Sequence, residues 1–77
     1  MIYNEAKELY LKTYPNHIVL SVLDVGDEWV FSAGDKETNL ELDSSPIAVN
    51  KETGKMRVFF PPMNMDKLKN AKQLTNI

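Results

Sequence analysis

The chain has 77 residues, no cysteine and a formal net charge of −2. This length fits a single domain, residues 1–77, with one small core, because a second core needs more chain. The lack of cysteine excludes a disulfide framework, a thiolate zinc site and a cysteine nucleophile, so we expect a reducing, cytoplasmic location. We expect neither a signal peptide nor a membrane span, since no long apolar run is present.

The first predicted element is a helix over about residues 4–14. Asn4 is a good N-cap, and Glu5 and Glu8 place negative charge in the first turn, where the helix dipole favours it. Apolar residues follow at helical spacing. Pro15 ends the helix because it has no amide hydrogen and disfavours helical geometry at the residue before it.

A β-hairpin is predicted next. Residues 17–25 are rich in β-branched and aliphatic side chains, and residues 28–33 alternate between apolar and smaller side chains. Gly26 between them supplies the positive φ that a tight turn needs. The alternation favours Trp29 as a core residue beside Phe31, and an exposed interface anchor is the alternative.

Residues 34–46 are polar and predict either a long loop or a short edge strand around residues 39–42. Two further strands, residues 47–50 and 55–60, are joined by a turn that Gly54 closes in a left-handed conformation. We expect these strands to form a second hairpin.

A second helix is predicted after Pro61 and Pro62, capped by Asn64 or Asp66 and reaching Thr75, with its lysines in solvent. The resulting order predicts an α+β fold. In it, the amino-terminal helix packs on a four-stranded antiparallel β-meander, and a short carboxy-terminal helix follows.

Strand alternation predicts one core face and one partly apolar opposite face. The core face is expected to carry Ile18, Leu20, Val22, Trp29, Phe31, Ile47, Val49, Met56, Val58 and Phe60. The opposite face is expected to carry Val19, Leu23, Val30, Ala48 and Phe59. Because this opposite face is too apolar to stay in water, we expect the second helix, a second copy or another protein to cover it.

No catalytic constellation is visible, so we expect no enzyme activity, no metal and no cofactor. The single histidine, His17, has no partner at a spacing typical of a triad or metal site, and a structural or surface role is expected. The acidic turn at Asp24, Asp27 and Glu28 lacks the spacing of a calcium loop and is expected to be solvated.

Nucleic acid is not an expected partner. The isoelectric point is about 5.2, and the basic stretch ending in Lys67, Lys69 and Lys72 has no interleaved aromatic residues. A third class, a small-molecule binder, would need a deep pocket, for which so small a core leaves little room.

Charge is distributed unevenly along the chain. Residues 24–43 contain seven acids and one base, whereas residues 51–72 contain six bases and two acids. A dense acidic patch steers a basic partner and raises its association rate. We therefore predict a partner-binding surface made of Asp24, Asp27, Glu28, Asp35, Glu37, Glu41 and Asp43.

The segment from Ser45 to Lys55, preceded by the aromatic strand Trp29-Val30-Phe31, resembles the small YrhB-type domain of bacterial immunity proteins. In that domain an aromatic strand is followed by a proline-led strand and a Thr-Gly hairpin. The resemblance covers about residues 5–60. The same hairpin also resembles PepSY-type domains, which are mostly exported or membrane-associated.

Two functions follow as expectations. The leading one is a cytoplasmic bacterial protein-binding domain, similar to immunity proteins that neutralise a partner toxin by occluding its active site. The alternative is a self-associating structural or accessory domain without catalytic activity, in which the second sheet face forms a homodimer. Neither function involves a membrane or a nucleic acid.

Overall fold

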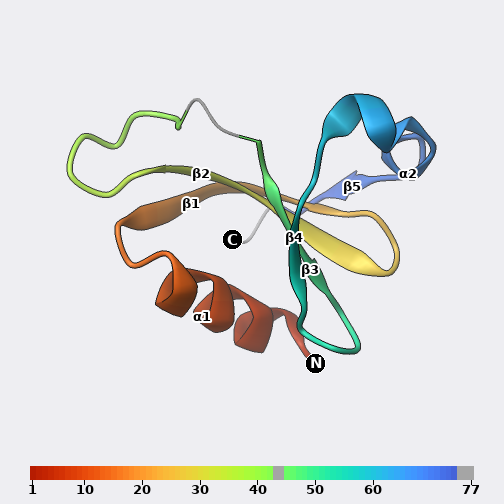
Figure 1. Cartoon of the computed structure of the whole chain (residues 1–77), viewed down its shortest axis with the longest axis horizontal. Coiled ribbons are helices and arrows are strands. Elements are labelled where there is room, and N and C mark those ends of the chain that lie inside the picture. Colours follow the sequence, from red (N-terminus) through yellow and green to blue (C-terminus); the bar gives the residue numbers. More distant parts are fainter. Residues whose placement is uncertain (43–44, 75–77) are drawn as a thin grey trace.

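In the computed structural model, which describes residues 1–42 and 45–74, a helix, an antiparallel sheet and a short carboxy-terminal helical segment form three layers (Figure 1). In chain order the elements are α1 (Tyr3–Thr13), β1 (His17–Asp24), β2 (Glu28–Asp35), β3 (Ile47–Asn50), β4 (Met56–Val58), the 3₁₀ helix η1 (Pro61–Met63), α2 (Met65–Leu68) and β5 (Lys72–Gln73). The predicted α+β fold is confirmed.

The sheet contains five strands in the order β4-β3-β2-β1-β5, with all neighbours antiparallel. The four-stranded meander is as predicted, whereas β5 was not expected. The turn between β3 and β4 is also confirmed: Gly54 has a φ of 72°, and the Asn50 side-chain oxygen accepts the amide hydrogens of Glu52 and Thr53.

Helix α1 lies along one face of the sheet and forms the main core with it (Figure 1). The helix begins after Ile2, whose amide donates to the Glu5 carboxylate at 3.0 Å, so Ile2 is the N-cap and the prediction of Asn4 was wrong. Ala6 and Tyr10 are fully buried against the sheet, where Trp29 and Phe31 are buried as predicted.

A β-bulge in β1 reverses the predicted facing of its first residues. Val19 pairs with Ala33 and Ser21 pairs with Ser32, so two steps along β1 oppose one step along β2. Because side chains alternate between faces, the extra residue, Leu20, moves Val19 into the core under α1. The predictions of Ile18 and Leu20 as core residues, and of Val19 as an opposite-face residue, were therefore wrong.

The carboxy-terminal segment covers part of the face opposite α1. Val30, Ala48 and Phe59 are buried there, and Leu68 of α2 packs against them together with Leu23. The sequence left three candidates to cover this face: the second helix, a second copy or another protein. In the structure, α2 covers this part of it. The apolar side chains on this part of the sheet need no second copy to be buried.

The predicted second helix is much shorter than expected. It ends at Leu68, and residues 72–73 pair with β1 as β5, while its predicted last residue, Thr75, lies outside the described residues. Two predicted core residues are also exposed: Val58, in the edge strand β4, has 60% of its surface in solvent, and Phe60, beyond the end of that strand, has 51%. These two predictions were wrong.

Residues 34–42 form a turn that folds back beside β2. Gly34 makes an isolated antiparallel bridge to Glu41, and the Asp35 amide donates to the Leu40 carbonyl at 2.8 Å. The Leu42 amide donates to the Ala33 carbonyl at 3.0 Å. The segment is therefore a loop fixed to the sheet by backbone hydrogen bonds rather than the alternative edge strand.

Substitution of Gly34 is expected to destabilise the fold, because a Cβ there would lie 2.9 Å from the Leu40 carbonyl oxygen and 3.0 Å from Leu20 Cδ1. Because this carbonyl belongs to the backbone, it cannot move away from the new Cβ without a shift of the loop. Gly34→Ala should lower the free energy of unfolding by about 1–3 kcal/mol, measured by urea denaturation. Ser32→Ala, on the same strand, is the matched control. Equal urea midpoints for the two variants would contradict this close approach.

Candidate functional site

The predicted acidic surface divides into two groups at opposite ends of the β1–β2 hairpin (Figure 1). Asp24, Asp27 and Glu28 lie at the turn, whereas Asp35 ends β2 and Glu37 and Glu41 lie in the loop after it. Strands of eight residues separate these ends by roughly 23 Å, at about 3.3 Å per residue. Asp43 lies outside the described residues. The acids therefore do not form one continuous patch.

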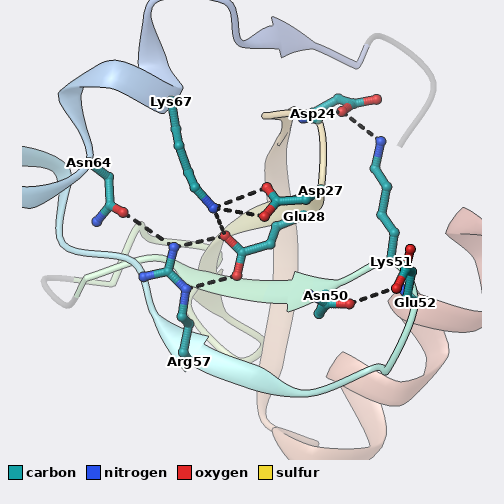
Figure 2. Close-up of polar contacts among 10 residues, drawn as sticks. Asp24, Asp27, Glu28, Asn50, Lys51, Glu52, Arg57, Asn64 and Lys67 are labelled. Carbon is teal, nitrogen blue, oxygen red and sulfur yellow. Dashed lines mark hydrogen bonds and ion pairs between the residues drawn. The ribbon is translucent and has the colours of Figure 1, made fainter.

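Glu28 is buried at the start of β2, with only 5% of its side chain exposed. Arg57 of β4 donates two hydrogen bonds to its carboxylate, one from Nε and one from Nη2, each 2.8 Å long. Lys67 of α2 donates to the same carboxylate at 2.8 Å (Figure 2). Since a buried carboxylate needs paired, hydrogen-bonded cations, this geometry accounts for its burial.

The cations hold the pKa of Glu28 far below its usual range. The hydrogen bond from Arg57 is the largest cause, burial acts in the opposite direction, and the bond from Lys67 lowers the pKa further, so that it falls from 4.5 to about 2. The same contacts raise the pKa of Arg57 and of Lys67. Glu28 is therefore ionised and buried in the folded protein.

The other two acids of the turn are also paired within the chain (Figure 2). Lys67 contacts both oxygens of Asp27, at 3.0 and 3.1 Å. Lys51 contacts Asp24 at 2.7 Å, and this hydrogen bond is the main cause that lowers the pKa of Asp24. Lys51 also lies 5.1 Å from the centre of the Trp29 ring.

These contacts change two predictions about the basic half of the chain. Lys67 was expected to be solvated, yet two thirds of its side chain is buried against the acidic turn. Glu28 was expected in a solvated turn and is buried instead. No local sequence pattern indicates that Glu28 pairs with Arg57 and Lys67, because Glu28 lies 29 residues before Arg57 and 39 before Lys67.

The acids of the loop after β2 have a different environment. Glu37 and Glu41 are exposed, and one oxygen of Asp35 accepts the amide hydrogens of Glu37 and Thr38. Within residues 1–42 and 45–74, no ion pair reaches Asp35, Glu37 or Glu41. The charges of Glu37 and Glu41 therefore face solvent, whereas Asp35 is half-buried.

Two exposed leucines accompany these acids. Leu20, the bulge residue, is 38% exposed, and Leu40, in the loop, is 69% exposed. The Leu20 side chain and the Leu40 carbonyl both lie against Gly34, which brings the two residues to the same end of the sheet. We call Leu20, Asp35, Glu37, Leu40 and Glu41 the loop surface.

Sequence reasoning missed these leucines as parts of a site. Leu40 carried a usable signal, because it is one of two apolar residues in an otherwise polar segment. Leu20 carried no such signal in the sequence, because its exposure results from the β-bulge.

His17 has a structural partner, as expected. Its Nδ1 lies 2.9 Å from the hydroxyl of Tyr10, and its ring stacks on Tyr14 at a centroid distance of 4.9 Å. Burial is the main cause that raises the pKa of Tyr10 to about 12, so the phenol keeps its proton. Nδ1 is the one hydrogen-bond partner of this buried hydroxyl among the described residues, so we expect the hydroxyl to donate to Nδ1 and the ring proton to be on Nε2.

Comparisons of the chain with protein-family models, curated proteins and solved structures found no significant match. Within the described part of the chain, no three histidine or acidic side chains gather closely enough to hold a metal ion. No helix in that part has the length and hydropathy required to cross a membrane.

The pairing of Glu28 predicts a pH-dependent contribution to stability. A pKa that is lower in the folded state than its usual 4.5 stabilises the fold above that pH and loses this effect as the pH falls toward 2. Near neutral pH, Glu28→Gln should lower the free energy of unfolding by about 2–3 kcal/mol. The deficit should shrink at about pH 3, measured by urea denaturation.

Glu52→Gln, on the exposed turn between β3 and β4, is the control for this experiment and should change stability by less than about 0.5 kcal/mol. A deficit for Glu28→Gln that is equally large at both pH values would contradict the pairing.

The Tyr10 contact predicts the tautomer of His17. In the wild-type protein at about pH 8, nitrogen-15 shifts of the imidazole should show the proton on Nε2 and an acceptor at Nδ1. Tyr10→Phe removes the donor and should move the tautomer balance toward Nδ1–H. A wild-type ring with its proton on Nδ1 would show that the hydroxyl accepts rather than donates.

Proposed function

We propose that this chain is a protein-binding domain that uses the loop surface to bind a basic surface of a protein partner. The observation that carries the proposal is the 69% exposure of Leu40 between Glu37 and Glu41, two exposed acids that form no ion pair with any described residue. An exposed apolar residue within an acidic rim has the composition of a docking site. The paired acids at the other end of the hairpin stabilise the fold and are not part of this surface.

The loop is held in place before any partner arrives. The Asn39 amide donates to the Asp35 carbonyl at 2.7 Å, and the Lys36 amide donates to Asn16 at 2.9 Å. The Asp35 amide also donates to the Leu40 carbonyl, and the Leu42 amide donates to the Ala33 carbonyl. These hydrogen bonds together fix both ends of the turn. A surface fixed in this way loses little conformational entropy on binding, which favours affinity.

Charge and apolar area have separate roles in this proposal. The acids accelerate association with a basic partner by roughly 10- to 1000-fold at low salt. Leu20 and Leu40 stabilise the complex once formed, since burying a leucine fully contributes about 1.5–3 kcal/mol. The partner therefore needs a basic rim around an apolar contact.

The particular role that we propose is that of a cytoplasmic immunity protein without enzymatic activity. The resemblance of residues 5–60 to the YrhB-type domain supports it. An acidic surface with an apolar centre suits the occlusion of a basic active-site cleft on a toxin. The partner in this role is a protein, and neither nucleic acid nor a membrane is bound.

Charge reversal tests the docking surface. Glu37→Lys with Glu41→Lys should slow association with the partner at low salt by at least about 10-fold, because the steering field is removed. The melting temperature should stay nearly constant, since both side chains are exposed. The partner is captured from the native cell on the immobilised wild-type chain, identified by mass spectrometry and purified for stopped-flow kinetics at low and high salt.

The matched control carries Glu8→Lys and Glu52→Lys, which produce the same net charge on exposed residues away from the loop. This control should retain the captured protein and its association rate to within about threefold. Equal loss in both double variants would mean that net charge alone matters, and it would contradict the assignment of the loop surface.

A further inference from the structure

Strand β4 forms an open edge of the sheet. It is the outer strand in the order β4-β3-β2-β1-β5, and within the described residues no strand pairs with its outer side. On the other side of the sheet, β5 covers the end of β1, and the bulge at Leu20 interrupts the remainder. Since bulges and partial covers protect an edge against added strands, β4 is the edge more open to pairing.

The hydrogen bonds between β4 and β3 alternate along the strand. The Lys55 carbonyl accepts from the Asn50 amide at 2.9 Å, and the Phe59 amide donates to the Pro46 carbonyl at 2.8 Å. Residues of an antiparallel pair alternate between pairs that exchange such bonds and pairs that do not. Every second residue between Lys55 and Phe59 therefore turns its backbone groups away from β3.

Met56 and Val58 are these outward-facing residues. Each has an amide hydrogen and a carbonyl oxygen at the edge, and none of these four groups has a hydrogen-bond partner among the described residues. Unpaired donors and acceptors at strand spacing fit one class of ligand, an extended backbone that supplies the complementary groups.

The side chains along this edge alternate between an apolar face and a basic face. Met56 packs on the core under α1, and Val58, which is 60% exposed, points to the same face. Arg57 lies on the other face, where its guanidinium carbon is 5.5 Å from the centre of the Phe59 ring. Alternation places Lys55 on this second face as well. A strand added here meets apolar side chains on one face and cations on the other.

Both cations have capacity for a further anion. Lys55 is exposed and forms no ion pair with a described residue. Arg57 donates to Glu28 and Asn64 through Nε and Nη2, so its Nη1 has no hydrogen-bond partner among the described residues (Figure 2). The Arg57 side chain is also 43% exposed. An acidic side chain beside these two cations would be complementary in charge.

A second copy of the chain fits this edge poorly. The antiparallel register that pairs Met56 with Val58 of the copy would satisfy all four backbone groups. It would also set Arg57 directly opposite the same residue of the copy, and like charges in that position destabilise a strand pair. The charge at the edge therefore favours an acidic strand over a second copy.

We propose that β4 receives an extended segment of a protein partner, in which apolar and acidic residues alternate, as a further strand of the sheet. The backbone of this segment bonds to Met56 and Val58. Its apolar side chains cover Val58, and its acids face Lys55 and Arg57. Main-chain bonds supply affinity in this mode of recognition, and alternate side chains supply specificity. The inference goes beyond the proposed function and does not depend on the loop surface.

The open edge can be tested in the free protein by amide hydrogen exchange. The amides of Met56 and Val58 should exchange at least about tenfold faster than that of Arg57, which faces β3. Equal protection of the three amides would show that the outward groups already have a partner, and it would overturn the proposal.

The probe for binding is an eight-residue peptide of alternating valine and glutamate, capped at both ends. Titrated into the full chain, it should shift the amide signals of Met56 and Val58 in a saturable manner, with a Kd of about 0.1–5 mM. The same peptide with lysine in place of glutamate should bind at least about fivefold more weakly. A glutamate peptide methylated on its valine amides should bind at least about tenfold more weakly, because it cannot donate to β4.

Variants of the chain separate backbone from charge. Val58→Pro removes one outward amide hydrogen, and proline is tolerated at an edge position of this kind. It should weaken binding of the glutamate peptide at least about fivefold, whereas Val58→Ile, which keeps the amide hydrogen, should stay within about twofold. Lys55→Glu, a change on an exposed residue, needs no backbone adjustment and should reduce the preference for the glutamate peptide at least about threefold.

Three outcomes would overturn the proposal. The first is a set of shifts that rise without saturation or map outside β4. The second is equal binding of the plain and methylated peptides, or of the glutamate and lysine peptides. The third is a shift of the Met56 and Val58 amides with protein concentration alone, which would place a second copy at the edge.

Discussion

The arrangement of this small domain depends on one buried carboxylate. Glu28 starts a central strand, and its two oxygens hold Arg57 of the edge strand β4 and Lys67 of α2. Moving an ion out of water costs several kcal/mol, so the carboxylate is tolerated only while both cations remain in place. The contact thus joins three elements that are distant in sequence, and it fixes α2 over the second face of the sheet.

This linkage divides the acidic half of the chain into two kinds of residue. Asp24, Asp27 and Glu28 are neutralised by bases from the second half, whereas Glu37 and Glu41 face solvent at the other end of the hairpin. A core of this size contributes only about 3–5 kcal/mol of net stability. Because Glu28 is buried, it cannot exchange Arg57 and Lys67 for an external partner without a large loss of stability.

Local signals in the sequence were enough to predict most of the secondary structure. Proline ended the first helix, Gly54 closed a turn, and alternation placed Trp29 and Phe31 in the core. Each of these features depends on residues a few positions apart. The polar composition of residues 34–42 likewise predicted an exposed acidic segment, although the sequence could not separate its acids from those of the turn.

Features that depend on distant contacts could not be predicted. The bulge at Leu20 follows from pairing with β2, and one extra residue was enough to reverse the facing of Ile18 and Val19. The end of α2 at Leu68 is decided by the pairing of β5 with β1. The partners of Glu28 are set by the tertiary fold, so the acidic turn looked solvated in the sequence.

The most direct test of the central contact is a carbon-13 NMR titration of the side-chain carboxyl of Glu28 in the wild-type protein. The geometry predicts a midpoint near pH 2, with Arg57 and Lys67 as the cause. A midpoint at the ordinary glutamate value of 4.5 would mean that the carboxylate is not held by these cations. Glu28 would then not be the group that joins the carboxy-terminal segment to the sheet.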